Sequence, residues 1–198
     1  AEASDCFAIL FVSDEKVKDA ESLRTFTEKY KSEELTKAAG DNNKKSQIYY
    51  TVGLIYEKGA DKFKQNSLLQ TALENYRLGH DTSPRHFAFS IPSQLRKGIT
   101  TEKIEGKNNA LVVYQDVVKQ YGNVHAEAVE EARRRILALV REGHANTFHV
   151  FASLSGLVRD DDYTWLGLNT PVRAKFNIES EQRSELMNVK ASDINNAN

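Results

Sequence analysis

The chain has 198 residues, of which 40% are hydrophobic and 28% charged, a balance typical of a globular domain with its own core rather than of a disordered segment. Its 27 Lys and Arg residues nearly offset its 28 Asp and Glu residues, so composition argues against a nucleic-acid binder and against a polybasic membrane-surface protein. The single cysteine, Cys6, excludes an intramolecular disulfide, and the low count of 3 Pro and 10 Gly favours helices over a turn-rich β fold.

The amino-terminal residues carry two weak signals about location. Ala1-Glu2-Ala3 is similar to the small-residue pattern around a signal-peptide cleavage site, which indicates a periplasmic or secreted protein, with a cytoplasmic protein as the alternative. The apolar run from Phe7 to Val12 is too short to span a bilayer, so no membrane insertion is expected.

The first predicted helix covers residues 14–39, within an amino-terminal helical segment of residues 1–43. Val17, Leu23, Phe26, Tyr30 and Leu35 recur at spacings close to one face of a helix, and the turn-forming residues around Gly40 end it.

Residues 46–143 are predicted to form pairs of helices. In chain order we expect helices over Ser46–Lys58, Asn66–Leu78, Pro84–Gly98 and Asn108–Tyr121, with Gly59, Gly79, Gly98 and Gly122 as the stops. Corresponding residues in the two pairs lie 38 or 39 apart: Ala72 and Ala110, Tyr76 and Tyr114, Gly59 and Gly98. A two-helix unit repeating at such a period is typical of an α/α superhelix, in which each unit buries its apolar face against the next.

The remaining elements are less regular. A helix is predicted from Val124 to Glu142, with ion pairs between Glu130, Glu131 and Arg133 to Arg135 on a solvated face. Residues 144–198 are predicted to hold a degenerate repeat and a carboxy-terminal helix, so that residues 1–198 form a single all-α domain.

Residues of the first helix pair resemble the Sel-like repeat, a longer relative of the tetratricopeptide repeat. Gly53, Tyr56, Gly59, Ala72 and Tyr76 fit its pattern, whereas the second pair matches at Gly98, Ala110 and Tyr114 and departs from it at Pro92 and Leu95. A third, degenerate unit is placed over residues 145–169, with Gly156, Trp165 and Leu166. The resemblance implies an α/α solenoid with a concave binding surface, of the kind used by adaptors, assembly factors, envelope proteins and immunity proteins.

Motifs for catalysis or metal binding are sparse. His80 and His86 lie six apart and His144 and His149 five apart, whereas two ligands on one helix face lie three or four apart. We therefore predict no catalytic residues, no metal and no cofactor. The alternative hypothesis is an enzyme or small-ligand-binding protein with a site near His144, His149 and Asp160–Asp162.

Aromatic and arginine side chains are the candidate anchors for a partner protein. We predict that Tyr49, Tyr56, Arg77, Arg85 and Arg96 line the concave surface. The structural alternative for the tyrosines is packing between helices. The function expected from the sequence is a scaffold or protein-binding protein, with another protein as its partner.

Overall fold

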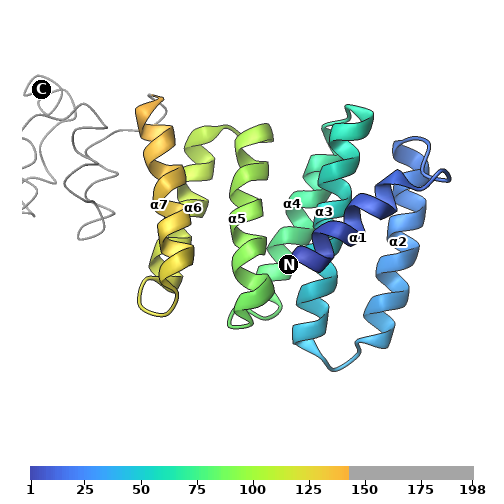
Figure 1. Cartoon of the computed structure of the whole chain (residues 1–198), viewed down its shortest axis with the longest axis horizontal. Coiled ribbons are helices and arrows are strands. Elements are labelled where there is room, and N and C mark those ends of the chain that lie inside the picture. Colours follow the sequence, from blue (N-terminus) through green and yellow to red (C-terminus); the bar gives the residue numbers. More distant parts are fainter. Residues whose placement is uncertain (143–198) are drawn as a thin grey trace, which may run out of the picture. The chain divides into compact units, whose positions relative to one another are not determined.

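The computed structural model describes residues 1–142, and these residues form seven α-helices and no strand (Figure 1). The helices are α1 (Glu2–Ser13), α2 (Ala20–Lys37), α3 (Asn42–Phe63), α4 (Ser67–Asp81), α5 (Phe87–Ile104), α6 (Lys107–Tyr121) and α7 (Ala126–Arg141). The all-helical prediction is confirmed over this range. The elements predicted after residue 143, including the third repeat unit, lie outside the described residues.

The chain divides into two units, Ala1–Val113 and Tyr114–Asn198, with the boundary inside α6. In the first unit α3 is the central helix, and α1, α2, α4 and α5 all pack against it. Figure 1 shows α2, α3 and α4 running alternately up and down while α1 crosses obliquely beside α3. The largest fully buried side chains of α3 and its neighbours are Leu23, Val52, Leu54, Ile55, Tyr56, Leu68 and Tyr76.

Helix α1 is an element that the periodicity of the sequence does not predict. It ends at Ser13, and a short connection leads to Asp19, whose carboxylate accepts a hydrogen bond from the Ser22 backbone N–H at 2.7 Å. The Ser22 hydroxyl in turn accepts from the Asp19 N–H, so this reciprocal cap starts α2 at Ala20, well after the predicted start at residue 14. None of the helices within residues 1–142 combines the length and apolarity needed to cross a bilayer.

The predicted stops at Gly59, Gly79 and Gly98 are wrong, because α3, α4 and α5 all continue past them. Two of these glycines serve helix packing instead. A Cβ on Gly59 would lie 2.1 Å from Leu23 Cδ2 of α2, and one on Gly79 would lie 2.4 Å from Ser93 Oγ of α5. The missing side chain therefore allows two helices to approach each other rather than ending one of them.

In the second unit, α7 begins at Ala126, two residues after the predicted start at Val124, and has one strongly apolar face. His125 caps it by accepting the Ala128 N–H at 3.2 Å. The predicted ion pairs are present: Arg133 lies 2.6 Å from Glu130, and Glu131 pairs with both Arg134 and Arg135. Arg133 is buried rather than solvated, so only part of this charged row faces water.

Candidate functional site

The two tyrosines predicted to bind a partner have different environments. Tyr49 is half-buried, with the Lys31 ammonium 5.4 Å from its ring centroid. Tyr56 is fully buried, and its hydroxyl donates a 2.6 Å hydrogen bond to Glu28. Burial, followed by this bond, raises the pKa of Tyr56 well above the usual value. Tyr56 therefore packs between α3 and α2, as the structural alternative proposes.

The three predicted arginines are also separated. Arg77 is on the exposed face of α4, where it pairs with Glu74 at 2.5 Å. Arg85 is exposed in the turn between α4 and α5, and Arg96 of α5 points back toward Glu57 of α3. Of these three arginines, Arg77 lines the groove on α4 and α5 that is described below. The hydrogen bond from Arg77 lowers the pKa of Glu74.

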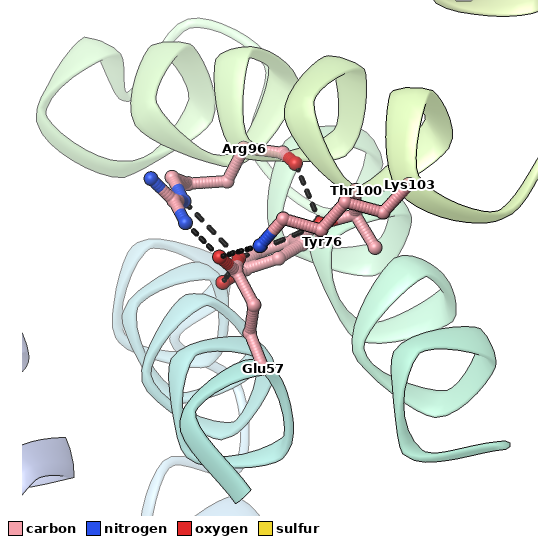
Figure 2. A network of polar contacts seen from close by, with 5 residues as sticks. All are labelled: Glu57, Tyr76, Arg96, Thr100 and Lys103. Atoms are coloured by element: carbon pink, nitrogen blue, oxygen red, sulfur yellow. Dashed lines mark hydrogen bonds and ion pairs between the residues drawn. The ribbon is translucent and has the colours of Figure 1, made fainter. Parts of the chain in front are cut away.

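A polar network surrounds Glu57, which is only 4% exposed (Figure 2). Its carboxylate accepts from the Tyr76 hydroxyl at 2.8 Å and from Arg96 Nε at 3.1 Å, and it pairs with Lys103 at 3.3 Å. A second Arg96 nitrogen also donates to it, and Thr100 Oγ1 lies 3.5 Å away. Tyr76 comes from α4, and Arg96, Thr100 and Lys103 come from α5.

This network connects α3, α4 and α5 and has the properties of a structural contact rather than of a reactive site. A buried carboxylate is costly unless charged and hydrogen-bonding partners replace its water, and here both oxygens are occupied. A carboxylate held in this way is a poor general base, because its lone pairs are engaged by donors. The local sequence does not reveal the network, since Glu57 and Arg96 lie 39 residues apart.

A polar groove of about 420 Å³ lies on α4, α5 and the first turns of α6. Its lining combines both charge signs with amide and apolar side chains: Gln70, Leu73, Glu74, Arg77, Lys97, Thr101, Glu105, Asn109 and Val113. Arg77 is engaged by Glu74, and the Asn109 amide donates to the Glu105 carbonyl at 2.9 Å. The groove therefore satisfies part of its own polarity internally.

A different surface, on α1 and α2, concentrates exposed apolar side chains. Leu10 is 72% exposed, Phe7 39% and Phe26 37%, whereas Ile9, 51% exposed, follows Phe7 by two residues and points to the other side of α1. Among the described residues, the other large apolar side chains with such exposure are Val112 and Val124, which lie elsewhere. We call this region the α1–α2 apolar surface and define it by Phe7, Leu10, Phe11, Phe26 and Tyr30.

Aromatic rings connect the two helices of this surface. The Phe7 and Tyr30 centroids lie 5.1 Å apart, and those of Phe11 and Tyr30 lie 5.9 Å apart. Phe11, Val17, Phe26 and Tyr30 also line a hollow of about 260 Å³ beside α1. Four charged residues complete the lining of that hollow: Asp14, Lys16, Lys29 and Glu33. An apolar hollow with charged residues around it is the usual anatomy of a protein-binding surface.

Helix α1 is fastened to α3 near both of its ends. The hydroxyls of Ser4 and Thr51 are hydrogen-bonded at 3.1 Å, and Lys62 Nζ donates to the Val12 carbonyl at 2.7 Å. Ala8 and Val12 are buried against the core between these contacts. The exposed apolar side chains of α1 therefore project from a helix with a fixed position.

One sequence signal could have located this surface. Residues 2–13 place apolar side chains on both faces of a helix, with Ala8 and Val12 inward and Phe7 and Leu10 outward. Such a helix shows no amphipathic period, which is why the pattern does not predict it. An apolar helix near a charged one signals a second buried face or an exposed patch.

The described histidines do not form a reactive cluster. His80 contacts Asp81 at 2.8 Å, His86 packs against Phe89 and His125 caps α7. Residues 1–142 hold no group of three His, Cys, Asp or Glu side chains suited to a metal ion. The alternative site near His144, His149 and Asp160–Asp162 lies outside the described residues. Comparison with protein-family models, with curated proteins and with solved structures yields no match for the chain.

Proposed function

We propose that this chain is a protein-binding protein and that the α1–α2 apolar surface is its binding face. The observation that carries the proposal is the concentration of exposed large apolar side chains, Leu10 above all, on two adjacent helices. Contiguous apolar area on a water-exposed surface is costly, and a partner that covers it gains about 25 cal/mol for each Å² removed from water.

The fixed position of α1 supports this proposal energetically. Association is opposed by the entropy lost when flexible groups become ordered. Phe7, Phe11 and Tyr30 already pack on one another, and the contacts of Ser4 and Lys62 hold the helix against α3. A partner would therefore meet a preorganised surface.

The test compares two substitutions of exposed aliphatic residues. Leu10→Glu places a charge at the most exposed side chain of the α1–α2 apolar surface, and Val124→Glu places the same charge at a site 60% exposed after α6. In affinity capture with the tagged full chain, we expect wild type and Val124→Glu to retain one stoichiometric protein partner. Leu10→Glu should weaken that binding at least tenfold, as expected when an apolar anchor is replaced by a charge that the partner must desolvate.

Circular dichroism and the thermal midpoint of each variant serve as the folding controls. Equal partner binding by folded Leu10→Glu and folded Val124→Glu would contradict the proposed face. Partner loss caused equally by both substitutions would point to a surface outside α1 and α2.

For the architecture, we propose that α3 with α4 is one unit of a Sel-like solenoid and that α5 with α6 is the next. The support is the spacing of Gly59 and Gly98, of Ala72 and Ala110, and of Tyr76 and Tyr114. An experimental structure tests it: the Cα atoms of Asn42–Asp81 should superpose on those of the α5–α6 pair with these residues equivalent. A failed superposition would leave an irregular helical bundle.

A further inference from the structure

Resting on the protein-binding function proposed above, we propose that the α1–α2 apolar surface binds a second copy of this chain about a twofold axis. A twofold interface brings the same patch of both copies together, so the patch must be complementary to itself. Two properties of the described residues, shape and charge, meet that requirement.

The shape of the surface pairs a ridge with a hollow. Leu10 is the most exposed apolar side chain of the ridge on α1, and Phe7 lies beside it on the flank nearest α2. The apolar part of the lining of the 260 Å³ hollow next to α1 comes from Phe11, Val17, Phe26 and Tyr30. In a twofold arrangement, the ridge of each copy enters the hollow of the other, and both apolar elements are covered at once.

The charges around the hollow are balanced in the same way. Asp14 and Glu33 supply two negative charges, and Lys16 and Lys29 supply two positive charges. Each copy therefore offers both signs, so acidic groups of one copy can face basic groups of the other. The formal net charge of the chain is −1, so long-range repulsion between copies is small.

Sedimentation velocity of the purified full chain over a range of concentrations gives the first test. We expect a concentration-dependent dimer for wild type and for Val124→Glu. Leu10→Glu should raise the dimer dissociation constant at least tenfold, because each interface would contain the substitution twice. A wild-type chain that remains monomeric at every concentration overturns the proposal, as does a dimer that Leu10→Glu leaves unchanged.

A charge-reversal pair gives a second test that does not depend on the apolar ridge. Lys16→Glu with Lys29→Glu makes the charged residues of the hollow all acidic. Asp14→Asn with Glu33→Lys leaves them basic, and the new amide oxygen can still accept the Lys16 backbone N–H, as the Asp14 carboxylate does. We expect each double variant alone to dimerise more weakly than wild type and an equimolar mixture to form the mixed dimer.

The mixed dimer would show that opposite charges meet across the interface, and a folding defect cannot produce that rescue. Two variants that dimerise as well alone as together would overturn the proposed arrangement. If the wild-type chain is monomeric but captures another protein through Leu10, self-association is wrong and the protein-binding function stands. If neither self-association nor Leu10-dependent capture occurs, both proposals are wrong.

Discussion

Glu57 is the residue on which three helices of the first unit converge. The carboxylate from α3 receives Tyr76 from α4 and both Arg96 and Lys103 from α5. Removing one partner of a buried ion pair lowers the free energy of unfolding by more than the intact pair contributes. The reason is that the remaining charged group stays partly buried without its counter-charge. The side chains of Arg96 and Lys103 are 32% and 37% exposed and can regain water, which limits the cost.

Glu57→Gln should lower the free energy of unfolding by about 2–4 kcal/mol, measured by urea denaturation. The matched control is Glu74→Gln, which removes a carboxylate from the exposed pair with Arg77 and should cost less than about 1 kcal/mol. Equal effects of the two substitutions would show that the buried network does not stabilise the helix packing.

The buried tyrosines predict how stability depends on alkaline pH. Burial is the largest cause that raises the pKa of Tyr50, to about 12, and burial also raises the pKa of Tyr76 well above its usual value. The unfolded chain ionises near pH 10, so the folded state holds protons that the unfolded state releases. Stability from these groups is complete below pH 10 and declines as the pH rises through about 12.

Absorbance at the tyrosinate band during an alkaline titration measures this effect. We expect some of the tyrosines to ionise only as the helical circular dichroism is lost, and protein in denaturant to ionise in one step near pH 10. Full ionisation near pH 10 with the helices intact would contradict the burial of Tyr50 and Tyr76.

At the scale of the helices, Gly59 shows how a close approach sets the packing of α2 on α3. A Cβ there would meet Leu23, which is fully buried. Gly59→Ala should gain roughly 1 kcal/mol in helix propensity and lose about 1–3 kcal/mol to overpacking, with a net loss of stability.

A double-mutant cycle checks this expectation. Leu23→Ala opens space at the contact, so Gly59→Ala should be less destabilising, or even stabilising, in the Leu23→Ala background. A strictly additive pair would show that Gly59 and Leu23 do not meet.

How far the sequence predicts these elements depends on how local the signal is. The helices around Tyr56, Tyr76 and Val117 follow from apolar residues at helical spacing, and all three are present. The helix around Val117 ends at Tyr121 as predicted, whereas those around Tyr56 and Tyr76 continue past their predicted ends, because a glycine that admits a neighbouring helix looks the same in sequence as a glycine that stops one. Helix α1 escapes prediction because its outer face is as apolar as its inner face.

The contacts of the candidate sites are harder to predict, because they join residues that are far apart in the sequence. Glu57, between Tyr56 and Lys58, reads as a solvated helix position, and its partners lie 19 to 46 residues away. Residue type alone places Tyr56 on a concave surface, whereas the packing of α2 decides its burial. Local patterns therefore predict which segments are helical, and long-range packing decides which residues remain accessible.

At the scale of the whole molecule, the core of the first unit is self-contained. Its buried cluster runs from Ala8 to Tyr76, and the partly buried side chains packed on it extend to Ile104. A fragment of residues 1–106 should therefore fold alone, with cooperative urea unfolding and the raised tyrosine pKa values retained. A fragment of residues 42–106, which lacks α1 and α2, should unfold at much lower urea because one side of α3 loses its cover. Equal stability of the two fragments would contradict the role of α1 and α2 in the core.

The central place of α3 also determines how fast its backbone amides exchange with solvent. Residues 50–57 of this helix are all buried, and four other helices pack around α3. The backbone amides of residues 50–57 can exchange with deuterium only when the surrounding helices separate. The exchange of these amides should therefore be the slowest in the first unit and should report the global opening of that unit. Backbone amides of α1 near Leu10, on the outer surface of the unit, should exchange faster than those of residues 50–57.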